Sequence, residues 1–551
     1  MSTRTHTVIN QAPPLVGYDV YAADPALTEG VARHTAPDVL AEVQEELGEL
    51  GRAAGSAQAQ RWGEEANAHS PVLRTHDRYG NRIDEVDFHP AYHRLLGHAV
   101  SAGLTDAWSR PSGHLRRAAG FVVWTQAEQG HGCPVSMTHA AVPALRTDPV
   151  LAAEWEPRLT SRAYAAELLP PGAKPGALFG MGMTEKQGGS DVRANTTRAE
   201  PLAEEGTYLL TGHKWFCSAP MSDGFLVLAQ APGGLTCFLL PRVLPDGTRN
   251  VFRIQRLKDK LGNRSNASSE VEFDGTWARR VGEEGRGVAT IIEMVAVTRL
   301  DCALGSAAIM RQAVAQAVHH AAHRSAFGGP LIDKPLMRNV LADLAVESEA
   351  ATTTVLRLAA AYDAAGSEQE RHFRRLAVAV SKYWITKRCP PLTAEALECL
   401  GGNGYVEESG LPRLFRESPL NSVWEGSGNV QALDVLRVLQ REPLALGAFL
   451  TEIGLARGAD HRLDGAIKSL LTELADLDGI EARARRVVER MALVLQGSLL
   501  VRFAPSPVAD AFCASRLGGD WGASFGTLPH TLDLGAIVDR ANPGSAADPG
   551  D

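Results

Sequence analysis

Two short segments of this 551-residue chain combine residue types that could hold a planar, charged ligand. Between Gly180 and Asp191, four glycines accompany Thr184 and Ser190; glycine lets backbone approach a ligand closely, and hydroxyl groups can donate hydrogen bonds to it. The segment 213–218 places Trp215 beside a phenylalanine, and such rings can stack on a flat ligand. Each segment alone has an ordinary structural alternative, a glycine-rich corner or an aromatic sheet core.

Two further segments carry charge. Glu425 follows Trp424 where glycines interrupt a helical pattern, and its carboxylate could act as a general base if apolar surroundings bring its pKa towards the working pH. A helix-capping acid on a solvated turn is the alternative. Arg324 precedes Phe327 and two glycines, so its planar guanidinium could hold a phosphate, although a lone arginine is more often a surface residue.

The elements that must position these residues follow from periodicity. Apolar residues three and four apart predict a helix from about Asp38 to Ala66, and helical periodicity returns over 91–170. The intervening 69–90 is typical of loop and short extended structure. Short alternating runs separated by turns predict strands of an antiparallel sandwich or barrel over about 177–281. Long helical patterns then run from Gly285 to about Arg516.

Composition excludes several classes of protein. Hydrophobic residues at 44% and charged residues at 22% are typical of a folded globular chain, and the net charge of −9 excludes a uniformly basic nucleic-acid binder. No dinucleotide or P-loop glycine motif occurs, and the single G-x-S-x-G match, at 522–526, lacks the strand–turn–helix setting of a nucleophile. Seven scattered cysteines without paired spacing predict reduced thiols and no metal site. The sequence shows no signal-peptide pattern and no apolar run long enough to span a membrane. We therefore expect a cytoplasmic protein.

Taken together and in order, these segments resemble the acyl-CoA dehydrogenase family of flavoproteins. Further runs, such as 256–268, narrow the resemblance to its adaptive-response branch, linked to DNA alkylation damage. The resemblance covers about residues 5–519, and the segments that carry it are Met183–Asp191, His213–Ser218, Arg324–Pro330, Leu397–Glu408 and Trp424–Asn429.

The resemblance implies a mainly α fold with a central β-domain. It implies an N-terminal helical domain (1–176), a middle antiparallel β-barrel or sandwich (177–284), a C-terminal four-helix bundle (285–441), an extra helical segment (442–517) and a flexible tail (518–551).

The resemblance also implies FAD as cofactor. Glu425 corresponds to the base that removes the α-proton of an acyl-CoA; the position used by another subfamily is Thr298 here, which cannot serve. Trp424 replaces the usual tyrosine and narrows the acyl channel, which argues against efficient turnover. Arg324 and Phe327 would reach the flavin of a neighbouring subunit, so a homotetramer is expected. The remaining residues implied at the flavin are Met183, Thr184, Gly189, Ser190, Trp215, Cys217, Ser218, Trp424, Gly426, Ser427, Gly428 and Asn429.

The extra helical segment is where the adaptive-response branch is expected to bind DNA. Its charge is nearly balanced, with eleven basic residues against ten acidic ones over 437–516. Arg483, Arg486 and Arg490 share one helical face and, with Arg437, are the predicted contacts to duplex phosphates. A solvated charged face is the alternative, and no base-reading motif appears, so binding would be nonspecific.

Two hypotheses follow. In the first, the chain is an FAD-containing protein of the DNA alkylation response that binds duplex DNA nonspecifically and has at most weak acyl-CoA dehydrogenase activity. In the second, it is a metabolic acyl-CoA dehydrogenase, an oxidoreductase acting on CH–CH groups, whose helical extension serves assembly only.

Overall fold

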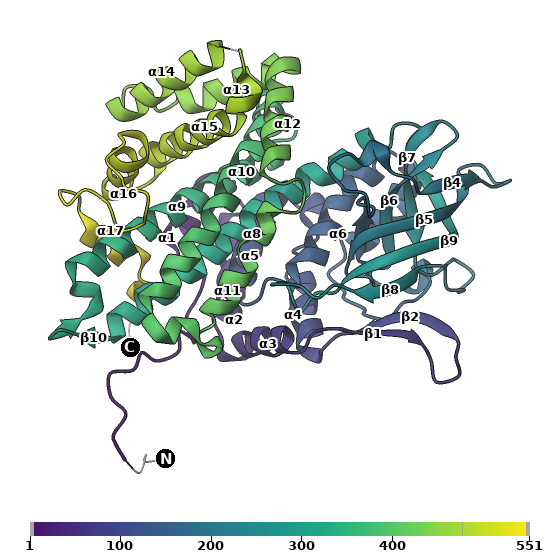
Figure 1. Cartoon of the computed structure of the whole chain (residues 1–551), viewed down its shortest axis with the longest axis horizontal. Coiled ribbons are helices and arrows are strands. Elements are labelled where there is room, and N and C mark those ends of the chain that lie inside the picture. Colours follow the sequence, from purple (N-terminus) through teal and green to yellow (C-terminus); the bar gives the residue numbers. More distant parts are fainter. Residues whose placement is uncertain (1–4, 477, 547–551) are drawn as a thin grey trace. The chain divides into compact units, whose positions relative to one another are not determined.

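The structure, a computed structural model, describes residues 5–476 and 478–546, and these form two compact units. One unit contains the chain up to Ala57, residues 122–126 and the chain from Cys302 onward. The other contains residues 58–121 and 127–301. Three helices include residues of both units: α3 (Ala57–Ala68), of which only Ala57 belongs to the first unit, α5 (Gly113–Trp124) and α8 (Gly287–His323) (Figure 1).

A seven-stranded sheet dominates the unit of residues 58–121 and 127–301. Five strands pair in a closed ring, because β6 pairs with both β4 and β7, and β5 and β9 complete the circuit. The remaining two join at the sides, β3 on β6 and β8 on β9. The strands are β3 (Phe179–Gly182), β4 (Arg198–Pro201), β5 (Thr207–Ser218), β6 (Gly224–Ala231), β7 (Gly234–Pro241), β8 (Arg253–Leu257) and β9 (Ser268–Val281).

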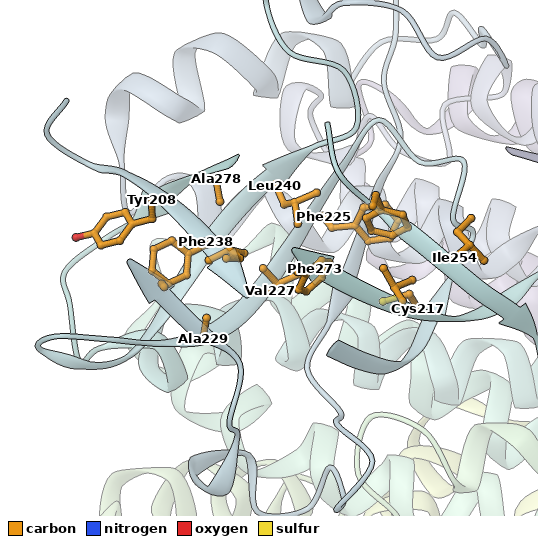
Figure 2. Close-up of a cluster of buried hydrophobic side chains, with 14 of the residues drawn as sticks. Tyr208, Cys217, Phe225, Val227, Ala229, Phe238, Leu240, Ile254, Phe273 and Ala278 are labelled. Atoms are coloured by element: carbon orange, nitrogen blue, oxygen red, sulfur yellow. The ribbon is translucent and has the colours of Figure 1, made fainter. Parts of the chain in front are cut away.

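The predicted barrel is therefore confirmed, with one difference in strand direction. We expected antiparallel pairing throughout, whereas β3 and β4 both pair with β6 in parallel. Alternating side chains fill the interior, where Phe225, Val227, Phe238 and Cys217 gather in the space that the strands enclose (Figure 2). Each fully buried aromatic or aliphatic side chain contributes about 1.5–3 kcal/mol to folding, so the interior side chains hold the barrel closed.

Helices accompany the barrel within its unit. The helix α6 (Gly132–Leu145) is buried on nearly all sides because its sequence is apolar all round, and it packs on β3 and on α7. Residues 69–90, expected as loop and short extended structure, form a hairpin of two antiparallel strands. The other elements are α3 (Ala57–Ala68), β1 (Val72–His76), β2 (Arg82–Asp87), α4 (Pro90–Ser101) and α7 (Pro149–Leu159).

The second unit is built around two long helices, α9 (Pro335–Asp363) and α10 (Glu368–Cys399), which pack on each other. The helices α12, α13 and α15 lie against α10, and α14 lies against α15 (Figure 1). Their bounds, with the others of this unit, are α1 (Pro25–His34), α2 (Leu40–Ala54), β10 (Ser325–Ala326), β11 (Gly329–Pro330), α11 (Leu411–Glu417), α12 (Gly428–Arg441), α13 (Pro443–Gly454), α14 (His461–Ala475), α15 (Ile480–Phe503), α16 (Ser506–Phe512) and α17 (Leu534–Ala541).

The helix predicted over Asp38–Ala66 is two helices, α2 and α3, separated at Gly55 and Ser56. Only glycine fits at position 55, since a β-carbon there would collide with the carbonyl oxygen of Tyr18. The chain up to Ala57 belongs to the same compact unit as the C-terminal helices, and α1 packs on α9.

Residues 518–546, which belong to the predicted tail, include one α-helix, α17 (Leu534–Ala541). This helix packs on α9, with Ile537 and Val538 buried. Arg540 donates two hydrogen bonds to Glu29 and others to Glu349, which pins the helix at sites far away in sequence. Composition alone gave no sign of these partners. In the part of the chain that the structure describes, no helix has the length and apolar character to cross a membrane.

Candidate functional site

The glycine-rich segment 180–191 and strand β5 are joined by a buried ion pair. The Lys214 ammonium lies 2.8 Å from Oε1 of Glu185, and both side chains are fully buried. The Glu185 carboxylate also accepts hydrogen bonds from the backbone amides of Thr196 and Thr197. Burial alone raises the pKa of Glu185, but Lys214 and these donors outweigh it and hold that pKa well below its ordinary value. Glu185 is therefore a structural carboxylate.

The residues that follow Glu185, from Lys186 to Ser190, are exposed at the surface. The Met183 carbonyl accepts from Asn195, and the Thr184 carbonyl accepts from the Trp215 amide at 2.8 Å. Gly189 lies so close to Thr184 that a β-carbon there would collide with the Thr184 hydroxyl. Gly189 and Ser190 are exposed, so their amides and the serine hydroxyl can reach a ligand.

Strand β5 separates its candidate residues onto two faces. Its pairing with β9 shifts register between Lys214 and Cys217, which brings Trp215 and Phe216 out of the barrel wall. The Cys217 side chain instead points into the barrel core (Figure 2), where burial raises the pKa of its thiol to about 12. Any contact of Cys217 with a cofactor must therefore use its backbone. The Ser218 hydroxyl is half-buried, 3.3 Å from that of Ser268.

Phe216, which the sequence reasoning did not include as a site residue, is the more accessible of the two rings, with 52% of its surface exposed. Cations surround the pair: the Lys258 ammonium lies 3.3 Å from the centre of the Trp215 ring and 4.7 Å from that of Phe216. Lys186 and Arg256 lie near the same indole. Glu270 pairs with both Lys258 and Arg256, so one carboxylate offsets part of this charge. The exposed aromatic surface with the remaining positive charge fits a flat ligand that carries negative charge.

The segment Trp424–Asn429 forms a turn at the start of α12, in the unit of the C-terminal helices. Glu425 has a left-handed backbone with φ of 58°, which costs a non-glycine residue about 1–3 kcal/mol. The following Gly426, with φ of 95°, supplies the second left-handed residue of the turn. The Trp424 indole donates to Asn421 at 3.0 Å. Neighbouring contacts must therefore hold this turn.

Two buried side chains provide those contacts. The Lys382 ammonium, on α10, donates to the carbonyl oxygens of Trp424 and Gly426 at 2.7 and 2.6 Å. The Gln431 amide, on α12, donates to those of Glu425 and Gly426 at 2.9 and 3.0 Å. The sequence reasoning missed both residues, because a lysine 42 positions away in the chain carries no local signal for this contact.

The start of α12 can favour an anion. Gly428 is buried against Tyr383 and Lys387, whereas Ser427 and Asn429 are exposed beside the first amides of the helix. Those amides and the helix dipole stabilise negative charge by about 0.3–1 kcal/mol at an exposed terminus. The residues of this turn thus fit the phosphate or ribityl part of a flavin, and the carboxylate of Glu425 adds a proton acceptor beside it.

Arg324 and Phe327 occupy a two-stranded hairpin, β10–β11. Phe327 has a left-handed backbone and is 95% exposed, and the half-buried Arg324 donates to the carbonyl oxygen of Asn10. The Asn10 side chain bonds both the amide and the carbonyl of Ser325, at 2.7 and 2.8 Å. The N-terminal segment thus braces the hairpin, and Phe327 projects as an apolar surface with no covering side chain.

Three of the four predicted DNA contacts converge on one carboxylate. Glu473, on α14, is nearly buried, and Arg483, Arg486 and Arg490 of α15 all pair with it. Arg486 has the most exposed side chain of the three, at 64%. Arg437 pairs instead with Asp434 on its own helix. The common face predicted on α15 exists, but a single acid ties its guanidinium groups together.

The structure groups the predicted cofactor residues within each unit. Met183, Thr184, Gly189, Ser190, Trp215 and Ser218 lie around one exposed edge of the barrel unit, whereas Trp424 to Asn429 form the turn of the helical unit. Thr298 is buried and donates to the carbonyl of Val295, as expected for a residue that is not a base. Within residues 5–476 and 478–546, no cluster of three or more acidic, histidine or cysteine side chains could hold a metal ion.

Family comparisons match three consecutive parts of the chain. The adaptive response protein AidB N-terminal domain matches residues 10–166, the acyl-CoA dehydrogenase middle domain matches 180–276, and the acyl-CoA dehydrogenase C-terminal domain matches 285–440. AidB of Escherichia coli (strain K12) is 45% identical over 525 residues, which span 94% of this chain and 95% of that protein.

Solved structures share the fold. ACDH-11 of Caenorhabditis elegans, in complex with C11-CoA, superposes with a TM-score of 0.83 at 26% identity, covering all of this chain and 94% of that one. An acyl-CoA dehydrogenase of Bacillus anthracis complexed with FAD gives a TM-score of 0.60 at 18% identity, covering 82% of this chain and 79% of that one. These likenesses show the acyl-CoA dehydrogenase fold. The match to the acyl-CoA dehydrogenase family supports FAD as the cofactor.

Proposed function

Because the chain belongs to the AidB branch of the acyl-CoA dehydrogenase family, we propose that it is an FAD-containing protein of the response to DNA alkylation. In this proposal it binds duplex DNA nonspecifically and has at most weak acyl-CoA dehydrogenase activity. The observation that carries the proposal is the 45% identity to Escherichia coli AidB over almost the whole of both chains.

FAD, when bound, supplies the hydride acceptor for oxidation of a CH–CH bond. The residues proposed to bind and orient it are those with amides and hydroxyls in Thr184 to Ser190, those of the Trp215–Ser218 edge, and those of the Trp424–Asn429 turn. Glu425 takes the α-proton of the acyl thioester on a carboxylate oxygen. The large Trp424 side chain, anchored by Asn421, restricts the space beside it, which is our reason to expect weak turnover.

DNA binding is proposed through α15. Three guanidinium groups around the single carboxylate of Glu473 leave a local excess of positive charge, which Asp476 offsets in part by pairing with Arg483. Contacts of this kind read phosphates and not bases. The overall charge of −9 repels DNA, so binding should be weak and should fade as salt approaches physiological concentration.

We also propose a homotetramer in the cytoplasm. The exposed Phe327 beside Arg324 is a surface suited to a neighbouring copy, where these two residues would reach its flavin. All seven cysteines lie within the described residues, are buried and form no disulfide, which suits a reducing compartment.

The alternative is a metabolic acyl-CoA dehydrogenase whose extension serves assembly only. It is favoured by the buried ion pair between Glu452 of α13 and Arg357 of α9, because this pair links the extension to the helical bundle as a structural part. Arg502 of α15 pairs with the same carboxylate and joins two helices of the extension. ACDH-11, which superposes over the whole chain, was crystallised with an acyl-CoA.

A pair of measurements separates the two functions. The purified protein should be yellow, and acid precipitation should release the flavin; a colourless protein that FAD cannot reconstitute would contradict both. Duplex binding by filter retention across a salt series is then run beside dye reduction with a panel of acyl-CoAs. Salt-dependent binding with slow reduction supports the first function, and rapid reduction without binding supports the second.

A further inference from the structure

Two side chains hydrogen-bond to the backbone around Glu425. Lys382 bonds the carbonyl oxygens that precede and follow this residue, those of Trp424 and Gly426. Gln431 bonds the carbonyl oxygen of Glu425 itself and shares that of Gly426. Three consecutive peptide carbonyls are thus held by two side chains from two helices, α10 and α12.

Both donors are almost entirely withdrawn from solvent, with 1% of each residue exposed. Lys382 donates two short hydrogen bonds to carbonyl groups of the turn. Charge-assisted bonds of this kind are stronger than neutral ones and fix direction as well as distance, so they determine the path of the backbone at this point.

The backbone conformation that these hydrogen bonds hold is an unfavourable one. Glu425 and Gly426 are both left-handed, with φ of 58° and 95°. Rotating Glu425 to an ordinary right-handed or extended conformation would turn its two peptide planes and pull the carbonyls away from Lys382 and Gln431. The same rotation would redirect the Cα–Cβ bond, and with it the carboxylate.

We propose that Lys382 and Gln431 are positioning residues that lock the left-handed backbone of Glu425 and thereby aim its carboxylate. This inference rests on the proposed role of Glu425 as the base. Neither side chain accepts the substrate proton; each acts through the peptide groups that carry Glu425.

The variants are chosen to separate local from global effects. Lys382→Met removes the donor at similar length, and Gln431→Leu provides an independent test if the first variant folds poorly. The matched control is Lys174→Met in the other unit. Lys174 is also a buried lysine that donates to two backbone carbonyls, those of Ala165 and Glu167, at 2.6 and 2.7 Å. It pairs in addition with the buried Asp223 at 3.1 Å, so Lys174→Met tests whether the loss of stability from removing a buried lysine is by itself enough to expose residues 424–428.

The first measurement is hydrogen–deuterium exchange of the flavin-loaded full chain. Amides of residues 424–428 should exchange about tenfold faster or more in Lys382→Met and Gln431→Leu, because their local opening becomes easier. The Lys174→Met variant should leave these amides unchanged. Protection that is unaltered in both test variants, or lost to the same extent in the control, would overturn the inference.

The second measurement compares kcat and KM on the best acyl-CoA. A misdirected base should lower kcat about ten- to a hundredfold with little change in KM, since small displacements of a catalytic group have effects of this size. The variant Glu425→Gln distinguishes a wrong assignment of the base from a wrong assignment of the positioning residues. If it retains full activity, the proposed base is wrong; if it is inactive while both test variants keep the wild-type kcat, only the positioning role is wrong.

Discussion

The Lys214 ammonium and the Glu185 carboxylate, 2.8 Å apart and both fully buried, join the glycine-rich segment after β3 to strand β5. Both residues lie in the segments that resemble the flavin-binding motifs, yet neither faces solvent. Their pairing explains how an exposed, glycine-rich backbone keeps one conformation beside the aromatic pair of β5, because the buried ion pair anchors the loop to this strand.

Replacing Lys214 should therefore destabilise the barrel unit. Lys214→Met leaves the Glu185 carboxylate buried without its cation, and such losses typically cost about 3–5 kcal/mol of unfolding free energy. Denaturant titration followed by intrinsic fluorescence measures the change. Lys468→Met, at an exposed position of α14, is the control and should shift the free energy by no more than about 0.5 kcal/mol. A Lys214→Met protein as stable as the control would disprove this role.

The same pair predicts acid sensitivity. The pKa of Glu185 is lowered in the folded state. Its contribution to the free energy of unfolding is therefore present above the ordinary carboxyl pKa of about 4.5 and is lost as the pH falls below that value. Thermal unfolding between pH 7 and pH 3 should show this loss. Glu185→Gln should be less stable at pH 7 but fall less steeply with acid, whereas the exposed Glu368→Gln should keep the wild-type slope. Parallel slopes in all three proteins would contradict the assignment.

Glu425→Gln should abolish most of any dehydrogenation. The amide cannot accept the α-proton, and loss of a general base typically costs about a hundredfold or more in rate. Flavin content should survive, because the peptide carbonyls that Lys382 and Gln431 hold are unchanged. Dye reduction and the visible flavin spectrum measure the two effects. Full activity in this variant would mean that the base lies elsewhere or that the activity is a contaminant's.

Substitutions that change the charge around the arginines of α15 should change the affinity for duplex DNA. Arg483→Ala/Arg486→Ala should lower the slope of log affinity against log salt by about one unit per lost phosphate contact, without changing sequence preference. Glu473→Gln should strengthen binding, because it removes the carboxylate that Arg483, Arg486 and Arg490 share. The exposed Arg52→Ala, on α2, is the control.

Filter binding at several salt concentrations measures these changes, with flavin content as a check on folding. If the double variant and Glu473→Gln both bind as the wild type does, the DNA site lies off this helix. Absence of wild-type binding at low salt would remove the DNA hypothesis altogether.

Local sequence determined much of this protein. Alternation of side chains along 207–240 is sufficient to predict barrel strands, and periodic apolar residues predict the long helices, because both patterns reflect the geometry of a single element. The glycine-rich and aromatic segments and Glu425 could also be identified as candidates, since their residue types alone limit the chemistry they can do.

Tertiary structure decided which of these residues face a ligand and what supports them. Trp215 and Phe216, although consecutive, both lie outside the core between the buried Lys214 and Cys217, because the register with β9 shifts between these two residues. Lys382 reaches the Glu425 turn across 42 residues of sequence, and Arg540 reaches Glu29 across 511. Such contacts depend on how whole helices pack, and that packing is set by the summed burial of many side chains, which no local pattern records.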